Sequence, residues 1–310
     1  MKQKKSKETK QKFSLDLMWR QRYLLMMSIP FVVWVIIFKY IPLWGWTMAF
    51  QEVIPKSFAL PIWERKFVGF DNFTQAFTDR LFAQTMINTI GISILGIFIG
   101  TAAAIIFALF LNEIRMKKFK QFTQTVSYLP HFVSWVIIAS IAKMLLNDGG
   151  AIETMFGVNF HLMSTNSPLF WIVVCLINVW KEVGWDAIIY LSAMAGIDQG
   201  IYEAAKVDGA NRFQQMWHIT LPGIKPTAVV LLIMSVGSAL NVGMERQMLL
   251  SNGIVQDHAM VLSWFAYIRG IGSNNYGIGT AIGMFQSVVG IILLFIANKV
   301  AGMIGENKLV

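Results

Sequence analysis

Several polar and aromatic side chains interrupt an apolar stretch in the middle of the chain. Glu182 and Asp186 are four residues apart, so they share one face of a helix. Carboxylate and amide groups can hydrogen-bond to sugar hydroxyls, and indole rings can cover the apolar side of a pyranose ring. The predicted substrate-pathway residues are Asn178, Trp180, Glu182, Trp185 and Asp186, with Asn241 as a weaker addition.

A structural role is an equally good explanation for these charged groups. Lys181 and Asp186 could pair with neighbouring helices, or a kink at Gly184 could let the charges reach water. Lys181 and Glu182 are adjacent in the chain, so a helix separates their directions by about 100°. We therefore expect these two side chains to face different partners.

Two further groups of polar residues are weaker candidates for a site. Asn241 is followed closely by Glu245 and Arg246, for which an interface pair at the outer end of a span is the favoured explanation. His131 and Lys143 are expected to be helix-packing or interface residues rather than parts of a site.

The composition indicates an integral membrane protein that must position these groups. Hydrophobic residues make up 55% of the 310 residues and charged residues 14%, below the roughly 25% of globular domains. Apolar runs of about 20 residues recur, and each can cross a hydrocarbon core about 30 Å thick. The net charge of +9 comes mostly from the ends of these runs, so it indicates membrane topology rather than nucleic-acid binding.

The apolar runs predict an all-α fold with six transmembrane helices. Their expected bounds are 23–41, 85–111, 126–146, 169–195, 227–242 and 277–296. The predicted organisation is a basic tail at 1–22, a first helix and external loop at 23–84, a transmembrane core at 85–303 that includes the loop at 203–222, and a tail at 304–310.

Small residues recur every four positions along the second predicted span, at Gly96, Gly100, Ala104 and Ala108. This spacing places a groove on one helix face, where a neighbouring helix can approach closely. Packing is the favoured explanation, and a pore-lining face with room for substrate is the alternative.

The basic residues predict the orientation of the spans. Of the 26 Lys and Arg residues, 17 lie in 1–22, in the loops at 112–124 and 196–225 and in 297–310, whereas the opposite side carries 6. Because the more basic side faces the cytoplasm, both termini and the loop at 196–225 are expected inside the cell. The chain is thus predicted to be a multi-pass protein of the cell membrane.

The stretch at 203–222 is predicted to form two short helices at the cytoplasmic membrane face. Ile201–Val207 has an amphipathic pattern, and Gly209 permits a turn that other residues resist. A second helix is expected at 212–218. It should end at Leu221–Pro222, because the residue before a proline is disfavoured in the helical region.

This stretch resembles the EAA loop of permease subunits of binding-protein-dependent ABC importers, which have the MetI-like fold. The family pattern is Glu-Ala-Ala, three residues, Gly, nine residues, Ile, one residue, and Leu-Pro. All seven fixed positions match, at Glu203, Ala204, Ala205, Gly209, Ile219, Leu221 and Pro222. From about 129 to 298 the chain is similar to the sugar-transporting branch. It is close to the maltose permease large subunit and most like the LplB-type permeases of Gram-positive bacteria.

The resemblance implies that the loop is a coupling helix that docks into a separate ATPase subunit, with Asp208 added to the seven motif residues as a contact. It implies a permease subunit of an ATP-driven importer for oligosaccharides or polysaccharide fragments. The implied partners are a second homologous permease, two ATPase subunits, an external sugar-binding lipoprotein and membrane lipid. ATP and Mg would be bound by the ATPase subunits, and no cofactor is expected in this chain.

The sequence contains no pattern for catalysis or for metal binding. There is no Gly-rich phosphate loop of the Walker type, and the four histidines lack metal-ligand spacing. Two other functions remain possible at this level: an ion-coupled secondary transporter that uses Glu182 and Asp186, and a non-transporting membrane scaffold. Neither explains the pattern at 203–222.

Overall fold

The structure of the chain, a computed structural model, describes residues 19, 21–157 and 167–303. The predicted tail at 304–310 and most of the predicted tail at 1–22 lie outside the described residues. Within them, the secondary structure is helical and contains no strand, only an isolated bridge between Gln51 and Phe67. The all-α prediction is confirmed.

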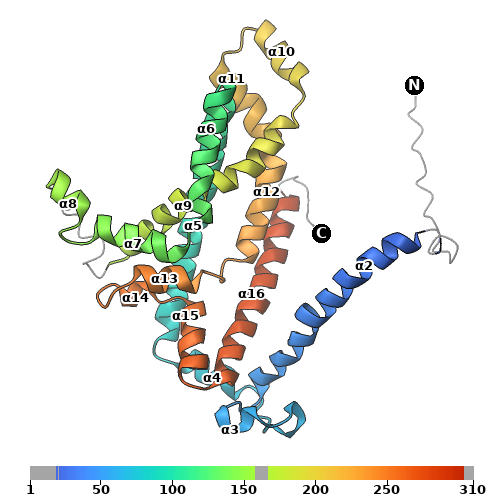
Figure 1. Cartoon of the computed structure of the whole chain (residues 1–310), viewed down its shortest axis with the longest axis vertical. Coiled ribbons are helices and arrows are strands. Elements are labelled where there is room, and N and C mark those ends of the chain that lie inside the picture. Colours follow the sequence, from blue (N-terminus) through green and yellow to red (C-terminus); the bar gives the residue numbers. More distant parts are fainter. Residues whose placement is uncertain (1–18, 20, 158–166, 304–310) are drawn as a thin grey trace. The chain divides into compact units, whose positions relative to one another are not determined.

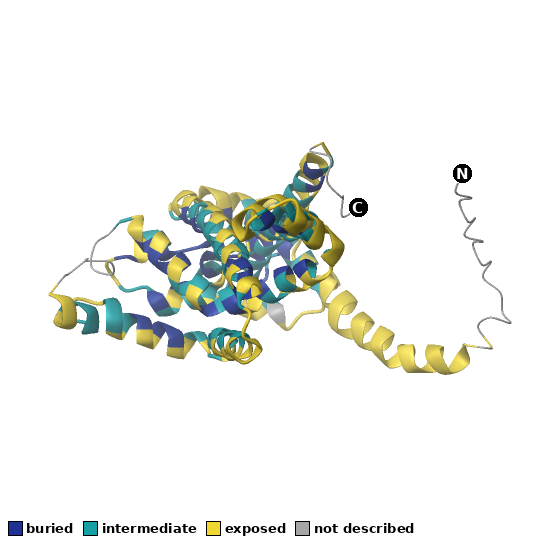
Figure 2. Cartoon of the chain, turned by 90° about the horizontal axis from the view of Figure 1, so that it is seen from above, coloured by how far each residue is buried: buried dark blue, intermediate teal, exposed yellow. Residues whose placement is uncertain are grey.

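The chain divides into two compact units, residues 1–47 and 48–310. In the first unit, helix α2 (Arg22–Val35) continues through the π-helical η1 (Ile36–Tyr40) into η2 (Ile41–Phe50), a 3-10 helix that extends past the unit boundary. No residue of α2 is buried, and Figure 2 shows the helix exposed along its length. A helix that is apolar on all sides and unburied has the character of a membrane span.

Four long helices dominate the second unit (Figure 1). They are α5 (Phe82–Glu113), α9 (Leu169–Ala195), α12 (Leu221–Gly237) and α16 (Tyr276–Met303). Five helical segments are long and apolar enough to cross a membrane: Arg22–Phe50, Phe82–Glu113, Trp135–Phe156, Arg212–Gly237 and Tyr276–Met303. Helix α9, the fourth predicted span, has 27 residues and the bounds that the sequence predicts, but it carries three charged side chains.

The third predicted span, 126–146, is wrong as a single continuous helix. It comprises the end of α6 (Lys117–Tyr128), the 3-10 turn η4 (Leu129–Phe132) and α7 (Trp135–Leu146). Pro130 lies at the start of η4, and the extended residues Val133 and Ser134 separate η4 from α7. The Ser134 hydroxyl then caps α7 by accepting a hydrogen bond from the Ile137 amide.

Short helices fill the segments before α5 and after α12. The segment before α5 contains α3 (Pro55–Phe58), η3 (Ile62–Glu64) and α4 (Asp71–Thr78). The segment after α12 contains α13 (Met244–Leu250), α14 (Gln256–Ala259), α15 (Leu262–Tyr267) and η6 (Ile268–Gly272). Another short helix, α8 (Ala151–Phe156), follows α7.

Buried polar groups of α5 fix the segment that contains α14 and α15. The Asn88 side chain donates hydrogen bonds to the carbonyl oxygens of Asp257 and Met260, at 2.7 and 2.8 Å. The next residue, Thr89, accepts a hydrogen bond from the Leu262 amide. These bonds satisfy backbone groups that would otherwise be buried without partners.

Helices α5 and α9 pack against each other more extensively than any other pair. The small residues of α5 fall into two pairs. Ala104 and Ala108 are buried against α9 and α12, whereas Gly96 and Gly100 line a polar cavity. The packing prediction is therefore confirmed for Ala104 and Ala108, and a pore-lining role of Gly96 and Gly100 stays a prediction.

Gly184 gives a direct test of how α6 is held on α9. Helix α9 is unbroken at this glycine, and a Cβ there would meet the backbone carbonyl of Ser127 in α6. We predict that Gly184→Ala destabilises the protein by about 1–3 kcal/mol, because backbone must move to make room. The matched control is Gly100→Ala, since a Cβ at Gly100 meets nothing within 4 Å. The measurement is the unfolding temperature of the purified protein in detergent. Equal shifts of this temperature in both variants would contradict the close packing of α6 on α9.

Candidate substrate groove and EAA loop

Side chains of α5, α9, α12 and α13 and of the segment after α12 line a polar cavity of 310 Å³, which we call the groove. Helix α9 supplies two polar groups to it, and α5 and α12 supply hydroxyl groups. The polar lining residues are Ser93, Thr101, Asn178, Asp186, Ser235, Ser238, Asn241 and Arg246. Asp186 and Arg246 are the charged residues among the described lining.

The groove brings together three of the six predicted pathway residues: Asn178, Asp186 and Asn241. Trp180 lies elsewhere, because it is exposed beside a mainly apolar cavity between α7 and α9. The remaining two, Glu182 and Trp185, lie in a separate cluster around His131.

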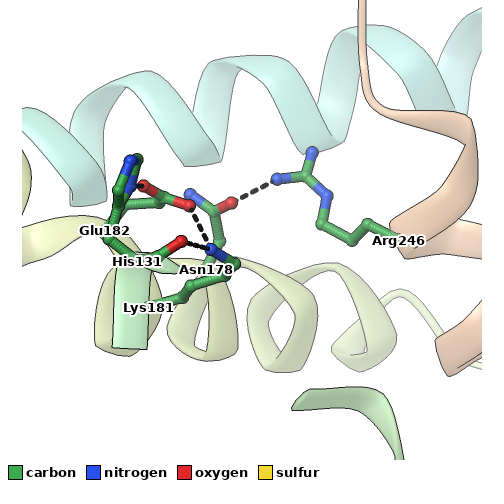
Figure 3. Close-up of polar contacts among 5 residues, drawn as sticks. All are labelled: His131, Asn178, Lys181, Glu182 and Arg246. Carbon is green, nitrogen blue, oxygen red and sulfur yellow. Dashed lines mark hydrogen bonds and ion pairs between the residues drawn. The ribbon is translucent and has the colours of Figure 1, made fainter. Parts of the chain in front are cut away.

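The His131 cluster consists of His131 in η4 with Lys181 and Glu182 in α9 (Figure 3). Lys181 Nζ donates to the His131 carbonyl oxygen at 2.5 Å and lies 3.1 Å from Glu182 Oε1. Glu182 Oε2 lies 2.5 Å from His131 Nδ1. Lys181 is only 5% exposed, so these contacts balance its charge in an apolar environment.

The expectation that Lys181 and Glu182 face different partners is therefore wrong. His131 presents two groups, a backbone carbonyl and a ring nitrogen, and the two long side chains converge on them. One explanation for the charge of Lys181 was a contact with a neighbouring element, and this contact is observed with η4. His131 has the packing role that the sequence indicates.

Trp185 extends the same cluster. Its indole ring stacks on the His131 ring, with centroids 4.4 Å apart and an interplanar angle of 3°. One face of Trp185 is thus covered by an imidazole, although the side chain is 42% exposed. This ring can offer at most its other face to a sugar.

Arg246 enters the groove from α13 and contacts α9. Its Nη1 donates to Asn178 Oδ1 at 2.6 Å (Figure 3), and its guanidinium lies 5.8 Å from the ring centroid of Trp135. Burial lowers the pKa of the Arg246 guanidinium, while the thiol of Cys175 and the charge of Glu182 act in the opposite direction. The predicted interface pair is not formed: Glu245 is exposed, and Arg246 turns inward. Lys143 has a packing role, because its ammonium group donates to the Ser251 carbonyl.

The EAA loop, residues 203–222, lies at the end of the bundle opposite α4 and α15 (Figure 1). Helix α10 (Gln199–Val207) is followed by α11 (Arg212–Gln215), and Gly209 joins them with a φ of +82°. Two short helices joined at this glycine are thus confirmed. Glu203, Ala204 and Asp208 are exposed, so they are available to a partner.

The predicted end of the second helix at Leu221–Pro222 is wrong. The π-helical turn η5 (Met216–Thr220) follows α11 and runs directly into α12, so Arg212–Gly237 forms one helical segment. The hydrogen-bond pattern shifts in η5 just before Pro222, and a proline in the first turn of a helix loses little by lacking an N–H. Ile219 and Leu221 are half-buried in this continuous segment.

Two polar contacts connect the EAA loop to the long helices. The Tyr202 hydroxyl lies 2.9 Å from the Thr220 hydroxyl and joins α10 to η5. Arg212 Nη1 lies 3.2 Å from Glu113 Oε2 and joins α11 to the end of α5. A polar cavity of 840 Å³ lies between these elements. A displacement of the loop would therefore act on both α5 and α12.

The geometry is that of a membrane transport subunit: spanning helices around a polar groove, with an exposed helical loop at one end. The chain belongs to the family of binding-protein-dependent transport system inner membrane components, whose model matches residues 96–302. It is thus a permease component of an ABC importer, a family of transport proteins rather than enzymes. Family membership favours this function over the ion-coupled transporter and the scaffold.

Individual relatives match over almost the whole chain. The chain is 40% identical to the polygalacturonan/rhamnogalacturonan transport system permease protein YteP of Bacillus subtilis, over 97% of this chain and 94% of that protein. It is also 40% identical to protein LplB of the same organism, over 94% and 92% of the two chains. A bacterial ABC transporter that imports the acidic polysaccharide alginate has a chain with a TM-score of 0.81 and 34% identity, over 93% of this chain and 98% of that chain.

Removal of Glu182 tests the structural role of the His131 cluster. We predict that Glu182→Ala lowers the free energy of unfolding by on the order of 2 kcal/mol, because the buried Lys181 ammonium loses its counter-ion. Asp186→Asn is the matched control, since Asp186 lies one turn further along α9 without an ion pair to a described residue. Equal thermal stability of the Glu182 variant and the wild type would contradict the assignment.

Proposed function

We propose that the chain forms half of the translocation pathway of an importer for oligosaccharides or polysaccharide fragments, and that the groove lines this pathway. The observation that carries the proposal is the set of hydroxyl, amide and carboxylate groups that line the groove between α5, α9 and α12. Such groups hydrogen-bond to sugar hydroxyls, and polar residues inside a membrane bundle commonly mark a substrate path. The carbohydrate names of YteP and of the alginate transporter support the substrate class.

The EAA loop transmits force in this proposal. Glu203, Ala204, Ala205, Asp208 and Gly209 present the surface that docks into a separate ATPase subunit. Ile219, Leu221 and Pro222 connect that surface to α12. Closure of the ATPase subunits then moves α12 through the continuous segment and α5 through the Arg212–Glu113 pair.

The complete importer contains a second homologous permease, two ATPase subunits that bind ATP and Mg, and an external sugar-binding lipoprotein. A structure of the alginate transporter in complex with a pentasaccharide-bound periplasmic protein supports the external binding protein in this proposal. Both termini and the EAA loop face the cytoplasm, as the distribution of basic residues predicts. The host is a Gram-positive bacterium, in keeping with its Bacillus relatives.

Variants of the EAA loop test the coupling role. We predict that Glu203→Lys and Gly209→Pro each reduce ATP-dependent oligosaccharide uptake at least about tenfold. The first reverses a docking charge, worth about 1.5–3 kcal/mol when hydrogen-bonded, and the second requires φ near −65° where the chain has +82°. Co-purification of the ATPase should weaken in both, while membrane insertion stays normal.

Val207→Ala is the matched control for these variants, because Val207 is an exposed residue of α10 outside the motif. It should retain uptake and ATPase binding. Normal uptake by the two motif variants would refute coupling through this loop.

Narrowing of the groove tests the pathway. Gly100 lines the groove, and a Cβ there meets nothing within 4 Å, so Gly100→Leu should fold and project into open space. We predict that this variant loses most oligosaccharide uptake while it keeps its thermal stability. Gly100→Ala, which adds one methyl group, should transport almost normally. Unimpaired uptake by the leucine variant would exclude the groove from the pathway.

A further inference from the structure

Arg246 is a partly buried cation without a counter-ion among the described residues. Its Nη1 donates to the neutral Asn178 side chain, and its buried Nε has no hydrogen-bond partner. No described carboxylate lies within ion-pair distance of it. The nearest compensating groups of Arg246 are the neutral Asn178 amide and the Trp135 ring, and Glu182 acts only from beyond ion-pair distance. Because a cation without a direct counter-ion is costly in a low-dielectric environment, an anion that enters the groove would be stabilised at this position.

The nearby carboxylates do not meet this need. Glu182 is already held by Lys181 and His131, so its charge is largely balanced within the His131 cluster. Asp186 lines the same groove but forms no ion pair with Arg246. The groove thus presents one cationic and one anionic group at separate points, with hydroxyl and amide groups between them.

We propose that Arg246 binds the carboxylate of a uronate unit, so that the groove favours acidic oligosaccharides over neutral ones. The proposal rests on the proposed function and specifies its substrate class. A guanidinium is a planar set of donors that can grip a carboxylate through two parallel hydrogen bonds. The bond to Asn178 orients the guanidinium through Nη1, and Nη2 makes no hydrogen bond to a described residue.

The other polar groups of the groove suit the remainder of such a sugar. Asp186 can accept hydrogen bonds from ring hydroxyls, and Ser235, Ser238 and Asn241 can both donate and accept. Asp186 does not lie within ion-pair distance of Arg246, so it does not occupy the guanidinium that would meet the carboxylate. The preference for acidic over neutral oligosaccharides is therefore expected to depend on Arg246. The negative charge of Asp186 is expected to weaken this preference.

The experiment measures the ratio of the uptake rates of an acidic oligosaccharide and a neutral one. A variant that is less active towards both leaves this ratio unchanged, so a general loss of activity is not mistaken for a loss of selectivity. Vesicles that contain the complete importer, with its binding lipoprotein, receive trigalacturonate or its fully methyl-esterified form, which has the same ring hydroxyls without the charges. Comparison is made between wild type, Arg246→Gln, Arg246→Lys and Asp186→Asn. The binding protein has its own preference between the acid and the ester, but this preference is the same for every permease variant. It therefore cancels when the ratios of two variants are compared.

We expect Arg246→Gln to lower the acid-to-ester ratio at least about tenfold, the loss of one charged hydrogen-bond pair. Arg246→Lys should retain more of the ratio, because it keeps the charge without the planar fork, and Asp186→Asn should leave the ratio unchanged or raise it. Thermal unfolding identifies a glutamine variant that fails to fold, in which case the lysine variant decides: it must show a smaller but measurable fall in the ratio.

The outcomes separate the inference from the proposed function. An unchanged ratio in the Arg246 variants, or a wild-type importer that moves only neutral oligosaccharides, overturns the carboxylate assignment alone. A wild-type importer that moves no member of a panel of acidic and neutral oligosaccharides overturns the proposed function as well.

Discussion

The balance of charge on α9 is the constraint on which the rest of the structure depends. Lys181 and Glu182 lie in the middle of a 27-residue helix within an apolar bundle, and neither charge is tolerable there without partners. Both are satisfied by His131, a residue of η4 that is brought to α9 by the break between α6 and α7. The close approach of Ser127 to Gly184 secures the same contact. The break between α6 and α7 thus lets His131 contact the charged side chains of Lys181 and Glu182.

This arrangement divides the polar residues of α9 by function. The charges of the His131 cluster are used to hold helices together, so they are poorly suited to a moving substrate. Asn178 and Asp186 lie on the side that opens toward α5 and α12, where Gly96 and Gly100 leave space. One and two turns further along α5, Ala104 and Ala108 pack closely against neighbouring helices. One helix face therefore serves as a wall of the groove and as a tight contact.

Local patterns predicted the structure well, and contacts between distant residues were not predictable. The bounds of α9 and the turn at Gly209 follow from hydropathy and from a motif contained within 20 residues. The partners of Glu182 and Asn178 lie 51 and 68 residues away, and neither His131 nor Arg246 carries a local signal of that role. Pro130 is a local signal for the break before α7, and the prediction of one span at 126–146 did not take it into account. Pro222 predicted the end of a helix, but η5 allows the helix to continue through this proline.

If sugar passes through the groove between α5, α9 and α12, it must pass Ser238, which lines the groove. Ser238→Cys, in a chain that also carries Cys175→Ser, tests this passage through the rate of labelling by a water-soluble thiol reagent. In the complete importer, we expect that the introduced thiol is labelled and that trigalacturonate slows its labelling only when ATP and the binding protein are present. Labelling at the same rate with and without sugar during turnover would show that sugar does not pass through the groove.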